Sequence, residues 1–68
     1  MTKILVTGSL GFLGQHLTRE LRGCGHEVYG ADLTHSANLS YLRADVADHG
    51  QLASAFNRFV PELVYHLA

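Results

Sequence analysis

The chain lacks the cysteine pairs and the histidine spacing on which cross-links and structural metal sites depend. It contains one cysteine, Cys24, so no disulfide can form within it. Its histidines show neither His-x-x-x-His nor His-x-His spacing; they are His16, His26, His35, His49 and His66. Because zinc sites are built from several closely spaced cysteine and histidine ligands, we expect no metal site.

Two further absences limit the classes of partner. Five Lys and Arg residues stand against six Asp and Glu residues and are dispersed, so they form no basic patch of the kind that binds nucleic acid. No apolar run approaches the roughly 18 residues of a membrane span. The first apolar run breaks at Thr7 and Gly8, too early for a signal-peptide core. We therefore expect no nucleic-acid or membrane partner, and a cytoplasmic location.

What is present suffices for one small packed domain. The 68 residues are 47% hydrophobic and 16% charged, which is the composition of a globular protein. A chain this short buries only about 60% of the surface that its unfolded form exposes. We expect a packed core of marginal stability, and we find no repeat, low-complexity tract or domain linker.

The first half of the chain alternates between strand and helix patterns. Residues 3–7 form a β-branched, nearly continuous apolar run, typical of a strand buried on both faces of a parallel sheet. A helical apolar stripe follows, made by Leu10, Leu13, Leu17 and Leu21. Gln15, Thr18, Arg19 and Arg22 fall outside that stripe. Gly23 is expected to end the helix in a left-handed cap, before a strand at 28–31 that leads into Asp32.

The second half repeats the alternation. Residues 34–38 are polar and predict a loop or short turn, and residues 41–45 predict a brief strand. Asp48 is placed to cap a helix that Pro61 closes, with one apolar side made by Leu52, Ala55, Phe56 and Phe59. Residues 63–68 form another strand of the buried type. This order predicts an α/β fold with right-handed crossovers and a parallel sheet.

Three equally spaced glycines separate the first strand from the first helix. In such a turn the first glycine permits a tight bend, the second lets a ligand approach, and the third allows close packing of helix on strand. Gly8, Gly11 and Gly14 fit these roles in order. The free amides of Phe12 and Leu13 would then face an anionic diphosphate, favoured there by the helix dipole. The alternative is that the glycines serve turn and packing alone.

An acidic residue stands where a dinucleotide site requires one. Asp32 lies 18 residues beyond Gly14, close to the roughly 20 expected, at the end of the second strand. It would accept hydrogen bonds from both hydroxyls of an adenosine ribose and repel a 2′-phosphate, so NAD is expected in preference to NADP. No Lys or Arg directly follows it. Its alternative role is that of a solvated loop acid.

Four stretches resemble those of extended short-chain dehydrogenase/reductases, the NAD-dependent epimerase/dehydratase family: TGSLGFLG, GHEVYGAD, RADVAD and PELVYHLA. The resemblance covers essentially the whole chain and implies a partial Rossmann-type sheet of about four strands. It implies that Gly8, Gly11, Phe12, Leu13 and Gly14 surround the pyrophosphate. It places Asp32 and Leu33 at the adenosine ribose, Asp45 and Val46 at the adenine, and Leu67 and Ala68 at the nicotinamide-side ribose. Without it, Asp45 could equally be an ordinary loop acid, and Leu67 and Ala68 simply core.

The catalytic machinery of that family has no counterpart here. Its Tyr-x-x-x-Lys pair is missing, because Tyr29 and Tyr41 are followed four places on by Leu33 and Asp45, and Tyr65 has no residue four places on. No catalytic residue is assigned, and the tyrosines are expected to serve packing. His66 is expected to be a hydrogen-bonded structural histidine, and Cys24 an incidental thiol.

We therefore expect residues 1–68 to be the N-terminal part of an NAD(P)-binding Rossmann domain, with the rest of that domain and the substrate domain outside it. A strand order of 3-2-1-4 would leave the last strand as an exposed apolar edge. The longer parent would be an NAD-dependent enzyme acting on a nucleotide sugar, and the resemblance allows a homodimer. Three alternatives stay open: a carbonyl reductase of the same superfamily, a non-catalytic NAD(P)-sensing regulator, and a complete 68-residue product with a structural or interaction role.

Overall fold

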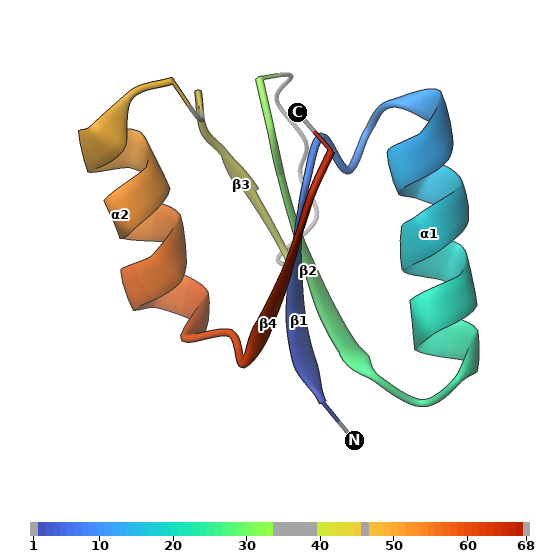
Figure 1. Ribbon diagram of the computed structural model, residues 1–68. Coiled ribbons are helices and arrows are strands. Elements are labelled where there is room, and N and C mark those ends of the chain that lie inside the picture. Colours follow the sequence, from blue (N-terminus) through green and yellow to red (C-terminus); the bar gives the residue numbers. More distant parts are fainter. Residues whose placement is uncertain (1, 34–39, 46, 68) are drawn as a thin grey trace.

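A computed structural model describes residues 2–33, 40–45 and 47–67. It contains one parallel sheet of four strands in the order β3-β2-β1-β4, formed by β1 (Lys3–Thr7), β2 (Glu27–Asp32), β3 (Tyr41–Arg43) and β4 (Leu63–His66). The helices α1 (Phe12–Gly23) and α2 (His49–Phe59) lie on opposite faces of this sheet (Figure 1). The partial Rossmann-type α/β fold predicted from the sequence, including its strand order, is confirmed.

The central strand β1 has apolar side chains on both faces, as its uninterrupted apolar run predicts. Toward α1, Ile4 and Val6 pack with Val28, and the partly buried Leu17 and Leu21 cover them. Toward α2 a second cluster gathers around Leu5; its buried members are Leu5, Ala31, Ala44, Ala55 and Phe59. The ring of Tyr29 stacks on Phe59, with centroids 4.4 Å apart. Each helix therefore closes one half of the core.

The face of α1 that packs on the sheet differs from the predicted leucine stripe. Gly14 and Thr18 are the buried residues of the helix, whereas Leu13 is 64% exposed. The expectation that Thr18 lies outside the contact face was wrong. Gly14 brings the helix backbone against the glycine loop, and this approach sets the contact line through Gly14, Thr18 and Leu21. Leu13, about 100° around the helix from Gly14, is thereby turned away.

The ends of α1, β3 and β4 also differ from expectation. The left-handed residue after α1 is Gly25 (φ 87°), not Gly23, which is the last helical residue. The N–H groups of Gly25 and His26 donate to the carbonyls of Arg22 and Leu21, over 3.0 and 3.2 Å, which is the bonding of a Schellman cap. The strand predicted at 41–45 ends at Arg43 and that predicted at 63–68 ends at His66. The loop predicted at 34–38 lies outside the described residues.

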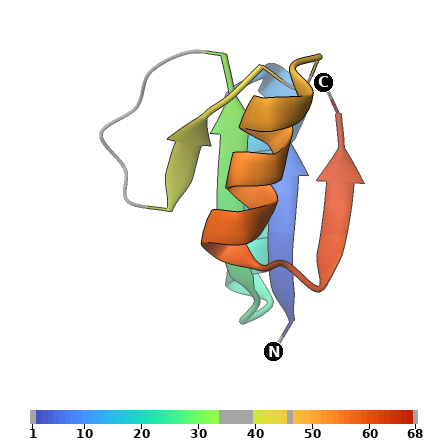
Figure 2. The same ribbon diagram turned by 90° about the vertical axis from the view of Figure 1, so that its left-hand side faces the viewer.

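Helix α2 matches its predicted bounds. Asp48 caps it, accepting from the N–H groups of Gly50 and Gln51, and the helix ends before Pro61. Ala55 and Phe59 are buried, whereas Phe56, predicted on the same side, is 39% exposed. In Figure 2, α2 lies across the sheet while β4 stands at its edge. The exposed Leu63 and Tyr65 make that edge apolar, as predicted.

Candidate functional site

The carboxyl ends of all four strands meet at one edge of the sheet, because every pairing is parallel. Figure 2 shows the strand arrows pointing to this common edge. The glycine loop follows β1 there, Asp32 ends β2, Asp45 follows β3, and Leu67 follows β4. The structure thus brings the described members of the predicted set to one edge. Val46 and Ala68, also predicted, lie outside the described residues.

Two of the three glycines are required by the chain itself. Gly8 has φ 71°, a backbone conformation that side chains disfavour, and its N–H donates to the Ala31 carbonyl over 2.8 Å. A Cβ on Gly14 would lie 2.1 Å from the Gly8 carbonyl oxygen. Gly11 differs, because its φ is −69° and its Cβ would meet that same oxygen at 3.4 Å, an ordinary contact. Nothing within the described chain requires glycine at position 11.

The first turn of α1 is finished without a side-chain cap. Gly11 is its N-cap residue, no side chain in the part of the chain that the structure describes accepts from the turn, and the turn has no acidic residue. The first N–H groups of any α-helix have no hydrogen-bond partner within that helix. In α1, the first backbone bond of the helix runs from the Gln15 N–H to the Gly11 carbonyl, over 2.9 Å. Phe12 is 84% exposed. The arrangement offers several N–H donors, reinforced by the helix dipole, to an anion.

The carboxylate of Asp32 is held in place from two sides. Its Oδ2 accepts the N–H of Leu10 over 2.9 Å, and its Oδ1 accepts the N–H of Leu33 over 2.7 Å. The first bond ties β2 to the glycine loop. A carboxylate has about four acceptor positions, so each oxygen retains capacity for a further donor. Asp32 is half-buried, and Leu33 is 59% exposed beside it.

A pocket of about 290 Å³ links Leu33 to Asp45, and its other lining residues are Arg43 and Gln51. The Arg43 side chain donates to the Leu33 carbonyl over 2.9 Å. Gln51 Oε1 accepts the Asp45 N–H over 2.7 Å. Sequence reasoning missed both residues, although Gln51 stands three places after the cap residue Asp48, the spacing of a capping box. The pocket adjoins the positions predicted for ribose and adenine.

At the end of β4, one bond joins Leu67 to the neighbouring strand. Its N–H donates to the Thr7 carbonyl over 3.2 Å. The Nδ1 of His66 lies 2.8 Å from Thr7 Oγ1, a contact that fits the structural histidine expected from the sequence. Thr7 is fully buried. The pair therefore fastens the exposed edge strand to the sheet beside the glycine loop.

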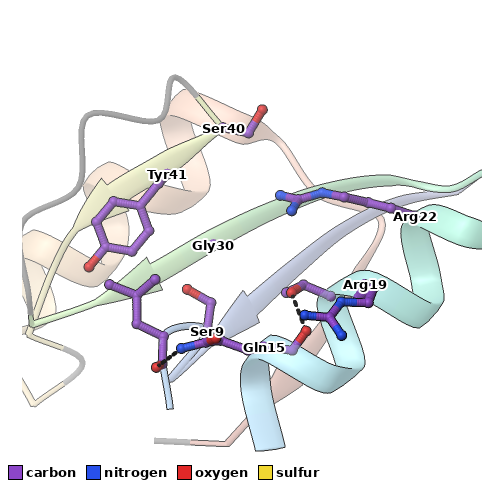
Figure 3. Close-up of a pocket in the computed structure, with 9 residues that line it drawn as sticks. Ser9, Gln15, Arg19, Arg22, Gly30, Ser40 and Tyr41 are labelled. Atoms are coloured by element: carbon purple, nitrogen blue, oxygen red, sulfur yellow. Dashed lines mark hydrogen bonds between the residues drawn. The ribbon is translucent and has the colours of Figure 1, made fainter. Parts of the chain in front are cut away.

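A second pocket, which the sequence did not predict, lies on the α1 side of β2 and β3. It measures about 500 Å³, and Ser9, Gly30 and Tyr41 are among the residues that line it (Figure 3). Two arginines of α1 line it as well, Arg19 and Arg22. Burial, together with the nearby negative charge of Asp32, raises the pKa of Tyr41 above its usual value. The pocket begins where the glycine loop lies on β2.

The residues that the structure describes contain neither a metal-binding cluster nor a membrane-crossing helix. Among those residues, no group of three or more His, Cys, Asp and Glu side chains could hold a metal ion. Within the same residues, neither helix has the length and apolar character needed to cross a lipid bilayer.

The sheet order and the glycine-rich turn into α1 define a Rossmann-type α/β protein. Residues 4–68 match the model of the NAD dependent epimerase/dehydratase family, and the chain belongs to that family. It is 39% identical over 79 residues to a probable dTDP-glucose 4,6-dehydratase of Sinorhizobium fredii, a match covering 97% of this chain and 23% of that protein.

Solved structures give the same result. UDP-glucose 4-epimerase of Thermus thermophilus, in complex with NAD, superposes with a TM-score of 0.84 at 32% identity, covering 96% of this chain and 23% of that one. WbmG of Bordetella bronchiseptica, in complex with NAD and UDP, gives 0.82 at 36% identity, covering 98% and 25%. The chain spans about a quarter of the length of the curated relatives it matches. It is homologous to their NAD-binding region.

Proposed function

We propose that the chain is the N-terminal part of an NAD(P)-binding Rossmann domain and that it holds NAD across the carboxyl edge of its sheet. The observation that carries this proposal is the uncapped first turn of α1, which begins at a glycine that the chain's own geometry does not require. A diphosphate satisfies such a turn, because it accepts from the amides and carries the charge that the helix dipole favours.

Each part of the cofactor would meet a different strand end. The diphosphate would lie against the glycine loop and the first turn of α1, formed by Gly8, Gly11, Phe12, Leu13 and Gly14. The adenosine ribose would bind Asp32 beside Leu33, and the adenine would lie near Asp45 and Val46. Leu67 and Ala68 would pass beneath the nicotinamide-side ribose. The remaining acceptor capacity of Asp32 and the pocket between Leu33 and Asp45 support this placement.

The charge of Asp32 gives the proposal its test. Isothermal titration of the chain with NAD and with NADP should show tighter binding of NAD, because the carboxylate repels a 2′-phosphate. Asp32→Asn removes the charge and retains an acceptor oxygen, so it should shift the affinity ratio toward NADP by about tenfold or more. Asp48→Asn, which removes an acid at the start of α2, is the matched control and should leave the ratio unchanged. Tighter binding of NADP by the wild-type chain would refute the preference.

We further propose that the parent protein is an NAD-dependent enzyme acting on a nucleotide-activated sugar, with the substrate held by residues outside this chain. Bound NAD would accept a hydride from a sugar carbon. The dTDP-glucose and UDP in the names of the similar proteins support this substrate class. Sequencing the coding DNA beyond codon 68 tests it. An in-frame Tyr-x-x-x-Lys pair would support the enzyme, and an immediate stop codon would overturn it for this product.

A further inference from the structure

Gly30 lies inside β2, where a strand residue ordinarily carries a side chain. Its φ is not positive, so its backbone conformation does not require glycine. The space above it does, because a Cβ on Gly30 would lie 2.4 Å from Ser9 Oγ, 2.8 Å from Ser9 Cβ and 3.3 Å from Tyr41 Cδ1. Figure 3 shows the Ser9 side chain between α1 and β2, with Tyr41 nearby on β3. Ser9 occupies the position of the missing side chain.

The hydroxyl of Ser9 does not explain why Ser9 sits there. Ser9 is 5% exposed, and its Oγ is buried without a hydrogen-bond partner among the described residues. The backbone around it is well bonded to β2, since the N–H groups of Gly8 and Ser9 donate to the Ala31 carbonyl, over 2.8 and 3.4 Å. The next N–H, that of Leu10, donates to Asp32. Ser9 therefore packs on the backbone of Gly30, which has no side chain. The residues on either side of Ser9 bond to the two residues that follow Gly30, namely Ala31 and Asp32.

We propose that Gly30 is a positioning residue for the cofactor site, an inference that rests on the proposed binding of NAD. Because Gly30 has no side chain, the glycine loop can pack directly against the backbone of β2. That approach aligns the Leu10 N–H with Asp32, and the bond in turn orients the carboxylate that receives the ribose. A Cβ on Gly30 would act through Ser9, because its clash with Ser9 Cβ cannot be relieved by rotating the hydroxyl. The loop backbone itself would have to lift away.

The test compares two Gly→Ala substitutions in the chain. Gly30→Ala should weaken NAD binding about tenfold, the factor expected when one hydrogen bond to a charged group is misaligned. Gly23→Ala is the matched control, because its Cβ would meet nothing within 4 Å. It should leave the dissociation constant for NAD unchanged. Without NAD, the amide resonance of Leu10 should move in Gly30→Ala and stay in place in Gly23→Ala.

Second-site variants separate positioning from stability. Gly30→Ala combined with Ser9→Gly should fold, restore NAD affinity and return the Leu10 resonance toward its wild-type position. Combination with Ser9→Ala should not restore them, because the Cβ contact at 2.8 Å remains. The inference is overturned if Gly30→Ala lowers the melting temperature without changing NAD affinity, or if Ser9→Gly fails to rescue binding. If the wild-type chain binds no NAD, the proposed function fails, and the Leu10 resonance of the unliganded variants still decides the coupling.

Discussion

The two helices begin at the same edge of the sheet, but their first turns are completed differently. At α2, Asp48 Oδ1 accepts from the N–H groups of Gly50 and Gln51, over 2.9 and 3.2 Å. At α1 the corresponding position is Gly11, which has no side chain to accept from the turn. Two amides of the α2 turn are thus bonded within the chain, whereas no side chain among the described residues caps the first turn of α1.

The largest expected effect concerns the packing of α1 rather than its ligand. Gly14→Ala places a Cβ 2.1 Å from the Gly8 carbonyl oxygen, a backbone atom that cannot turn aside. We expect a loss of about 3 kcal/mol in the free energy of unfolding, enough to unfold so small a domain. Urea titration followed by circular dichroism measures it. In α2, Gly50→Ala meets only the Asp48 Oδ1 atom at 3.3 Å and should cost far less. Equal stability of the two variants would contradict the close approach.

Exchanging the type of cap tests the ligand directly. Gly11→Asp gives α1 a cap like that of α2, and the ordinary contact of its Cβ at 3.4 Å leaves room for the side chain. The carboxylate would occupy the amides and repel a diphosphate, so NAD binding should weaken about 100-fold, while stability stays equal or rises by about 0.5 kcal/mol. Calorimetric titration measures the affinity. Gly11→Asn also caps the helix but adds no charge, so it separates the effect of capping from that of charge. Undiminished NAD affinity in Gly11→Asp would show that the first turn of α1 does not bind the diphosphate.

The reverse exchange at α2 should act on stability. Asp48→Ala leaves the amides of Gly50 and Gln51 without their acceptor, and we expect the free energy of unfolding to fall by about 1 kcal/mol. NAD affinity should change much less than in Gly11→Asp, because the α2 turn is not the proposed diphosphate site. Chemical denaturation and NAD titration of the same sample measure both. A larger loss of NAD affinity than in Gly11→Asp would reverse the roles of the two helices.

The smallest expected effect is a pH dependence of stability that arises from Tyr41 on β3. The pKa of Tyr41 is raised, first by burial and then by the charge of Asp32, above its ordinary value of 10.0. The folded state therefore holds this proton more tightly than the unfolded state does. The resulting stabilisation is fully present below pH 10 and is lost as the pH rises through the folded-state pKa. Melting temperatures between pH 9 and 11 should fall more steeply for the wild type than for Tyr41→Phe; parallel curves would contradict the shift.

The sequence predicted those features that depend on neighbouring residues. The apolar run of residues 3–7 became β1 without change, and Asp48 capped α2 as its residue type and position indicated. The parallel order followed from the alternation of strand and helix patterns. These features are encoded locally, or follow from the general handedness of strand crossovers.

Features that depend on tertiary approach were not predictable in this way. The face of α1 shifted from Leu13 to Thr18 because the backbone contact at Gly14 fixes how the helix is rotated. The packing of Ser9 on Gly30 joins residues 21 positions apart, and no local pattern marks it.

The most direct test of the contrast between the two helix starts is an NMR titration of the ¹⁵N-labelled chain with NAD. The account predicts saturable shifts of the Gly11, Phe12 and Leu13 amides, larger than that of Gly50, whose amide Asp48 already holds. A titration in which the Gly50 amide moves most, or in which the α1 amides do not respond to NAD, would contradict it.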